Sequence, residues 1–130
     1  RAKERVPAGD AVTVLSLGTG HAPPLRLEAL ELLLDTIARM RSIVDSIESR
    51  DRDLARQIRR AASSAALNLA EADGSDRGNR RARLHTALGS LREARVGLRV
   101  AVAWGYLDDV AEAERALDRV AAMIWGLLRR

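Results

Sequence analysis

The chain has 130 residues, of which 47% are hydrophobic and 31% charged, as expected for a single soluble domain with one core. It contains no cysteine, which excludes disulfides, thiol nucleophiles and thiolate metal sites and favours a cytoplasmic location. Aromatic residues make up only 2% of the chain, which nearly excludes nucleic-acid binding by stacking bases on aromatic side chains.

Positive charge exceeds negative charge by four, and 21 of the 22 basic residues are arginine. The guanidinium group is a planar fork suited to phosphate and carboxylate. An arginine bias can also follow from genome composition, so the position of the charge is more informative than its amount.

Residues 1–24 contain all three prolines of the chain and show no helical period. We predict a flexible N-terminal extension here, without a role in function. Within it, residues 11–17 (AVTVLSL) alternate enough to pair as a short strand if a partner edge exists.

A helical pattern begins at Leu27 and runs to about residue 48. Ser49, Asp51 and Asp53 are all candidate N-caps for a second helix, which ends near residues 73–74. The apolar seam of the first helix follows spacings of 3 and 4 and comprises Leu30, Leu33, Ile37, Met40, Val44 and Ile47. The seam of the second consists mostly of small residues and comprises Leu54, Ile58, Ala61, Ala62, Ala65 and Leu69.

Residues 74–79 (GSDRGN) have the composition of an exposed turn, and Asp76 or Asn79 is expected to cap a third helix that Gly105 ends. Asp108 is expected to cap a fourth. The third seam comprises Leu84, Ala87, Leu91, Ala94, Leu98 and Ala101. The fourth comprises Val110, Ala113, Leu117, Val120, Ile124 and Leu127.

Four amphipathic helices with short connections predict an all-α, antiparallel up-and-down four-helix bundle over residues 25–130. No interior segment has the period of two that a strand requires. The first helix also carries Leu32 and Leu34, and the fourth Trp125 and Leu128. This is more apolar surface than one seam hides, so a second copy is expected to cover one face. The alternative is a wide monomer core with a few exposed leucines.

Three blocks carry a family resemblance: residues 57–62 (QIRRAA) with Ser64 and residues 68–71 (NLAE), residues 87–91 (ALGSL) with Glu93, and residues 105–107 (GYL). Their order and spacing resemble those of the four-helix bundle proteins encoded by intervening sequences of bacterial 23S ribosomal RNA genes. The resemblance spans about residues 27–128.

The chain departs from the family pattern at Ala66, where the family usually has proline, and at Ala72, where it usually has glycine. A straighter second helix is therefore expected. The first helix is aliphatic rather than aromatic-rich, so contacts made by aromatic residues there do not carry over.

The resemblance implies a ring-forming subunit. The related accessory variability protein of diversity-generating retroelements is a homopentamer with a basic surface that associates with a reverse transcriptase and nucleic acid. A homopentamer, RNA or DNA, and a reverse transcriptase are thus the partners that the resemblance suggests, while it supplies no enzymatic activity.

A polar stripe crosses the small-residue interface of the second and third helices, comprising Ser64, Asn68, Glu71, Ser90 and Glu93. The structural interpretation is that these groups hydrogen-bond across the bundle and fix its register. The alternative is a ligand pocket built on Asn68, Glu71 and Glu93. Neither His21 nor His85 completes a carboxylate–histidine metal motif, so we expect no metal, no cofactor and no catalysis.

Charge is concentrated on the third helix, where residues 77–107 contain seven arginines and one acid. The functional interpretation is an electrostatic nucleic-acid surface that contacts phosphates without reading bases. The candidate residues are Arg59, Arg60, Arg77, Arg80, Arg81, Arg83, Arg92, Arg95 and Arg99. The alternative is a solvated helix surface with ion pairs between subunits, to the acidic first and fourth helices.

The sequence therefore predicts a non-enzymatic, oligomeric bundle that binds nucleic acid or scaffolds a nucleoprotein complex. The alternative is a protein–protein adaptor or structural subunit without nucleic-acid binding.

Overall fold

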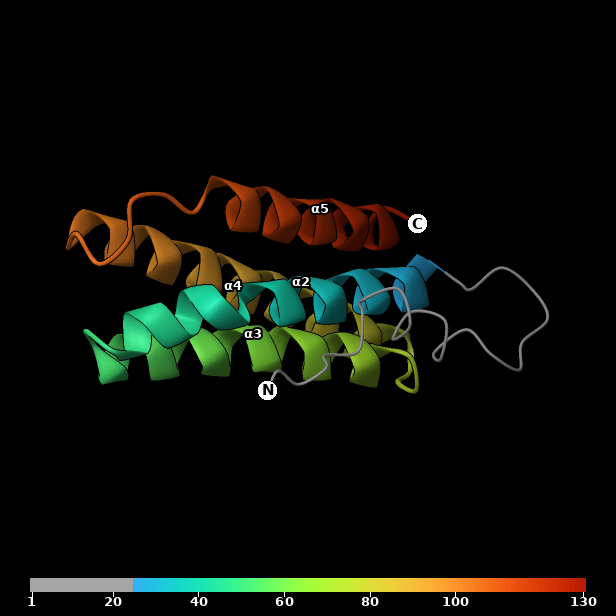
Figure 1. Cartoon of the computed structure of the whole chain (residues 1–130). Helices are drawn as coiled ribbons and strands as arrows, with labels where there is room; N and C mark the ends of the chain where they lie inside the picture. Colours follow the sequence, from blue (N-terminus) through green and yellow to red (C-terminus); the bar gives the residue numbers. More distant parts are fainter. Residues whose placement is uncertain (1–24) are drawn as a thin grey trace, which may run out of the picture.

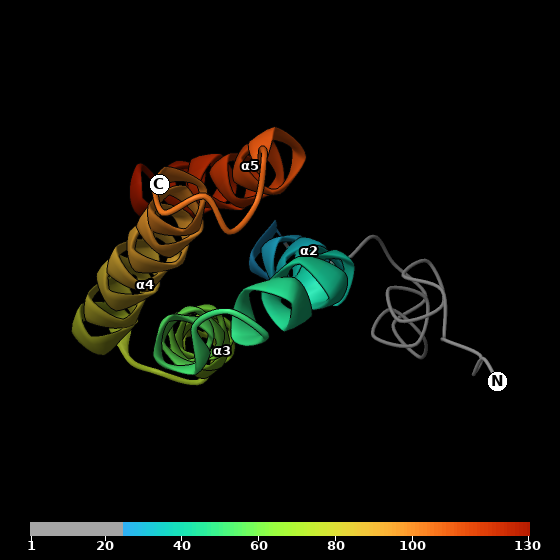
Figure 2. The same ribbon diagram turned by 60° about the vertical axis from the view of Figure 1, so that its left-hand side comes forward.

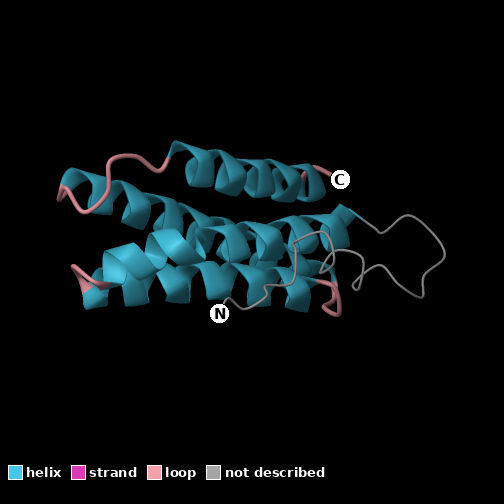
Figure 3. Ribbon diagram, viewed as in Figure 1, coloured by secondary structure: helices cyan, strands magenta, loops and turns pink. Residues whose placement is uncertain are grey.

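The computed structural model describes residues 25–130, and the extension with its expected strand lies outside this range. The described chain forms four helices and no strand: α2 (Leu25–Glu48), α3 (Arg52–Ala72), α4 (Arg77–Ala103) and α5 (Ala111–Leu128) (Figure 1, Figure 3). Consecutive helices run antiparallel, and the all-α bundle predicted from the sequence is confirmed.

Each helix packs against two others, in the cyclic order α2, α3, α4, α5. Figure 2 shows the four helices around a common centre, with α2 and α4 at opposite corners. This is the arrangement of an up-and-down bundle, in which short connections join spatial neighbours.

The predicted apolar seams form the core. Every seam residue of α4 and α5 is buried, as is the seam residue Val110 just before α5, and so are all those of α3 except the half-buried Leu54. In α2 two predicted seam residues, Leu30 and Ile37, are only half-buried, whereas Ala29 and Thr36, which the seam did not include, are buried. Thr36 is accommodated because its hydroxyl donates to the carbonyl of Leu32 at 2.8 Å.

Side-chain caps begin two of the helices as the sequence predicts. Asp51 accepts a 3.0 Å hydrogen bond from the amide of Leu54 at the start of α3. Asp76 accepts a 2.9 Å bond from the amide of Asn79 at the start of α4. Each carboxylate satisfies an amide that has no partner inside the helix.

The expected cap of α5 was wrong. Asp108 does not cap the helix, which begins two residues later than predicted, after Val110. Val110 is 5% exposed, and burial of its side chain extends the connection to this point. The first amide of α5, that of Ala111, is satisfied instead by the carboxylate of Asp109 at 2.7 Å.

A glycine turn ends α4 and directs Tyr106 to the neighbouring connection. Gly105 has φ of +82°, and the amides of Gly105 and Tyr106 donate to the carbonyls of Val102 and Ala101, the pattern of a Schellman C-cap. The Tyr106 hydroxyl donates to Asp51 at 3.0 Å. Since Asp51 also caps α3, this bond joins the α4–α5 connection to the α2–α3 turn.

The helices α3 and α4 lie close together at Gly97. A Cβ atom at Gly97 would lie 2.6 Å from Cγ1 of Ile58, which is buried. Only a residue without a side chain fits there. At Gly89, two turns earlier on α4, a Cβ would meet nothing within 4 Å.

The variant Gly97→Ala is expected to lower the free energy of unfolding by about 1–3 kcal/mol, because the new methyl group displaces Ile58 in a packed core. The control Gly89→Ala is expected to raise it by about 0.5–1 kcal/mol, because alanine restricts the unfolded chain more than glycine does. Urea titration of both variants measures the difference, and equal effects would contradict the close approach at Gly97.

Tyr106 is the only tyrosine of the chain, so its ionisation can be followed by ultraviolet absorbance. The hydrogen bond to Asp51 raises the pKa of Tyr106 above 10.0 in the folded protein. The bond therefore contributes stability below pH 10, and this contribution is lost as the pH rises through the raised pKa. Asp51→Asn, which keeps a capping side chain, is expected to return the pKa toward 10.0; an unshifted pKa in the parent protein would exclude the bond.

Candidate nucleic-acid interface

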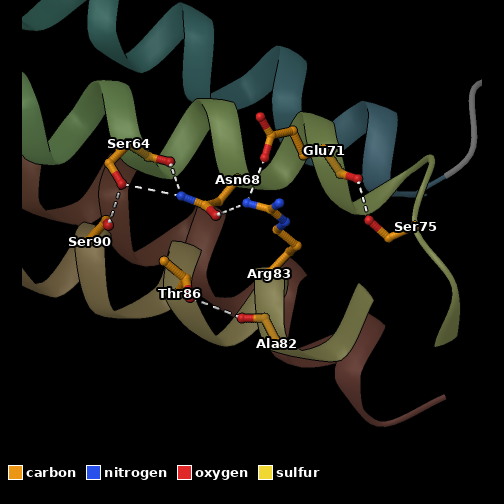
Figure 4. Close-up of polar contacts among 8 residues, drawn as sticks. All are labelled: Ser64, Asn68, Glu71, Ser75, Ala82, Arg83, Thr86 and Ser90. Carbon is orange, nitrogen blue, oxygen red and sulfur yellow. Dashed lines mark hydrogen bonds and ion pairs between the residues drawn. The ribbon is translucent and has the colours of Figure 1, made fainter. Parts of the chain in front are cut away.

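Four of the five residues in the predicted polar stripe are joined in one network. The Ser90 hydroxyl lies 3.0 Å from that of Ser64, and the Asn68 amide nitrogen donates to the hydroxyl and the carbonyl of Ser64 at 3.2 and 2.9 Å (Figure 4). Arg83 reaches from α4 to α3, where it lies 2.6 Å from Glu71 and donates to Asn68 at 3.3 Å. The structural interpretation of these four residues therefore fits their contacts.

Glu93 is the exception in the stripe. It is exposed and makes no hydrogen bond or ion pair within residues 25–130. It lines a groove of about 370 Å³ between α3 and α4, together with Gln57, Arg60 and the two serines of the network. Of the three residues of the alternative ligand pocket, Asn68 and Glu71 are engaged by Arg83, and Glu93 is not.

Removal of Asn68 is expected to cost stability, whereas removal of Glu93 is not. Asn68→Ala should lower the free energy of unfolding by about 1 kcal/mol, since it breaks the hydrogen bonds that connect Ser64 to Arg83. Glu93→Ala should change it by less than about 0.5 kcal/mol, as is usual for an exposed residue without partners. Thermal or urea unfolding compares the two variants, and a larger effect at Glu93 would contradict the network.

Four of the predicted nucleic-acid-binding arginines are held in ion pairs within the protein. Arg83 pairs with Glu71 of α3. Arg95 lies 3.4 Å from both Glu114 and Asp118, and Arg99 lies 3.4 Å from Glu114. Arg95 and Arg99 thus face the acidic residues of α5, and the ion pairs partly neutralise the charge of all three arginines.

Arg59 is the fourth predicted arginine that is held in ion pairs. It lies 2.8 Å from Glu48 and 2.9 Å from Asp45, both on α2. Its hydrogen bonds and charge interactions with Glu48, and then with Asp45, raise the pKa of Arg59 above its usual value. Arg59 thus joins α3 to α2 across the surface.

The remaining predicted arginines have no carboxylate partner within the described residues. Arg60 and Arg92 are exposed and border the grooves between the helices. Arg77 is exposed and Arg80 half-buried at the start of α4. Arg81 donates to the carbonyl of Leu128 at 2.9 Å, which fastens the start of α4 to the last turn of α5.

Two further arginines lie at the same end of the bundle and were not predicted as site residues. Arg129 and Arg130 follow α5 directly, are exposed, and pair with no carboxylate in the described part of the chain. The antiparallel packing of α5 on α4 brings them to the start of α4, and the hydrogen bond from Arg81 to the carbonyl of Leu128 fastens the two ends.

We call this group the arginine end; it comprises Arg77, Arg80, Arg81, Arg129 and Arg130. The nearby acids of the α3–α4 connection are engaged in their own interactions: Asp76 caps α4 and also accepts from the side chain of Asn79, and Asp73 has a partner. The guanidinium groups of the arginine end are therefore the ones best placed to accept an external anion.

In residues 25–130, no three histidine or acidic side chains are arranged to hold a metal ion. His85 is exposed, and its ring meets that of Trp125 edge to face. None of the four described helices is both long and apolar enough to cross a membrane.

Comparison with known proteins gives one match. Residues 27–126 match the family model described as 23S rRNA-intervening sequence protein. Neither the curated proteins nor the solved structures contain a significant match to the chain.

Proposed function

Since the chain belongs to the family of 23S rRNA-intervening sequence proteins, we propose that it acts without catalysis, as an oligomeric bundle in the cytoplasm that binds nucleic acid through electrostatic contacts. The family and the fold leave the function open, because one fold serves many functions. The proposal therefore depends on the site.

The observation that carries the proposal is the arginine end. Five arginines gather where α4 begins and α5 ends, none of them paired with a carboxylate of residues 25–130. Arginines bind phosphate oxygens in a bidentate manner, and unpaired ones need break no ion pair to do so. Contacts of this kind position a nucleic acid without reading its sequence.

The absence of catalysis is supported by the same contacts that define the network. The carboxylate of Glu71 is engaged by Arg83, and Asn68 is engaged by Ser64 and Arg83. Glu93 forms no hydrogen bond with Glu71 or Asn68. A general acid or base needs a reacting partner within hydrogen-bonding distance. The hydroxyls of Ser64 and Ser90 bond to each other, and no carboxylate of the described chain bonds to either.

Self-association is the second part of the proposal. Most apolar side chains of α2 and α5 are buried in the protomer core, including Leu33, Ile124, Leu127 and Leu128. Leu34 and Trp125 remain exposed on these two helices. Leu67, Val96 and Trp104 are exposed elsewhere. The pentamer remains an expectation from the resemblance, as does a reverse transcriptase as protein partner.

Light scattering after size exclusion, at low and high salt, tests both parts of the proposal. We expect a salt-stable oligomer near five subunits that binds RNA or DNA at low salt and releases it at high salt. An adaptor that binds only proteins through the exposed apolar residues would ignore nucleic acid, and its interface would respond little to salt. A monomer that binds no nucleic acid at low salt would contradict both parts.

The variants that localise the contact change three arginines at a time. Replacement of Arg77, Arg80 and Arg129 by glutamine is expected to reduce the slope of log affinity against log salt by about 0.7–0.9 for each phosphate that is no longer bound. The control replaces Arg59, Arg95 and Arg99, which removes the same charge from ion-paired positions. A control that weakens binding as much as the first variant would contradict the assignment to the arginine end.

A further inference from the structure

Trp125 lies beside the arginine end with much of its ring uncovered. It is in the last two turns of α5, is 45% exposed, and meets the ring of His85 at 6.2 Å with an interplanar angle of 84°. This edge-to-face contact fixes the position of the indole ring while leaving part of it open.

Three unpaired arginines lie near this pair of rings along the two helices. Arg129 lies one helical turn after Trp125, and Arg81 lies one turn before His85. Trp125 also lines a shallow groove of about 150 Å³ between α4 and α5, where Arg92 has no carboxylate partner within the described chain. The indole is therefore flanked by unpaired positive charge from two helices.

The acid that lines this groove does not cancel that charge. Asp118 borders the groove together with Arg95, and the two side chains lie 3.4 Å apart. Because Asp118 and Arg95 balance each other, the unpaired Arg92 keeps the groove beside Trp125 positive on balance.

Trp104, the other tryptophan, lies in a different environment. It is 70% exposed at the end of α4 and borders a groove of about 560 Å³ that is also lined by Asp51, Asp53 and Glu93. Asp53 is paired with Arg56 at 2.6 Å and Asp51 accepts from Tyr106, so within residues 25–130 the unpaired charges of this groove are those of Glu93 and Arg92, which offset each other. Exposure alone would favour this ring, but the groove beside it offers no net positive charge to a phosphate.

We propose that Trp125 is a base-stacking platform and that the nucleic acid bound at the arginine end is single-stranded. This inference rests on the proposed function, which does not distinguish single-stranded from double-stranded nucleic acid, and it adds that choice. Bases inside a duplex are stacked on each other and present no face to an indole, whereas a single strand can place one base on the ring and its phosphates on the arginines.

The scarcity of aromatic residues limits this platform to a single ring. A low aromatic content excludes several adjacent base-stacking sites. The structure nevertheless places the exposed indole of Trp125 near unpaired arginines. A single stacked base alters affinity by about tenfold, and the phosphate contacts supply the remainder.

The test uses the full chain with one reporter tryptophan at a time. Trp104→Phe leaves Trp125 as the only indole, and Trp125→Phe leaves Trp104. Each protein is titrated at low salt with a 12-nucleotide oligouridine and with an RNA duplex of the same length, and binding is followed separately by the anisotropy of a labelled strand.

We expect the oligouridine to quench emission in Trp104→Phe and to leave it unchanged in Trp125→Phe, with the duplex quenching neither. Trp125→Ala should weaken binding of the single strand about tenfold and Trp104→Ala should not. Thermal unfolding checks that Trp125→Ala is folded, and Trp125→Leu, which retains apolar bulk without an aromatic face, should lose the same affinity.

Strand binding without quenching of Trp125, or quenching of Trp104 instead, would overturn the stacking role and leave the proposed function in place. Equal binding of duplex and single strand would overturn the choice of strand. Emission of Trp125 that shifts with protein concentration and ignores the oligonucleotide would assign the ring to a contact between copies. Absence of any binding at low salt would overturn the proposed function as well.

Discussion

The close contact of α3 and α4 at Gly97 determines how the rest of the molecule is arranged. Because Gly97 has no side chain, Ile58 occupies the space that a Cβ would fill, and the two backbones approach. Small residues along α3 extend the same contact. At this separation the hydroxyls of Ser64 and Ser90 are within 3.0 Å, and Arg83 can reach Glu71. The packing thus fixes the rotation of α4 about its own axis.

That rotation decides which arginines are available to an external partner. Residues of α4 that face α3 or α5 find carboxylates there, as Arg83, Arg95 and Arg99 do. Exposed ion pairs of this kind contribute only about 0–1 kcal/mol each to stability, yet any phosphate must compete with them. At the arginine end, where no such carboxylate partner is found within residues 25–130, the competition is absent.

The sequence predicted the core well because a period of 3.6 residues determines which side chains face inward. It also predicted the caps at Asp51 and Asp76, which depend on neighbours within three residues. It offered ion pairs of the arginines with the first and fourth helices only as contacts between subunits, whereas Arg59, Arg95 and Arg99 make such pairs within the protomer. The cap at Asp108 was wrong because burial of Val110, a tertiary contact, overrode the local signal.

The two tryptophans show how far composition can guide a functional assignment. By composition alone the two tryptophans are equivalent, and two rings are too few to form an extended base-stacking surface. Exposure distinguishes them in favour of Trp104, at 70% against 45%. The charge around each ring reverses that order, since unpaired arginines flank Trp125, whereas beside Trp104 the unpaired Glu93 offsets the single arginine, Arg92. A polyanion with exposed bases must satisfy both the stacking face and the surrounding charge, and in the described chain only Trp125 offers the two together.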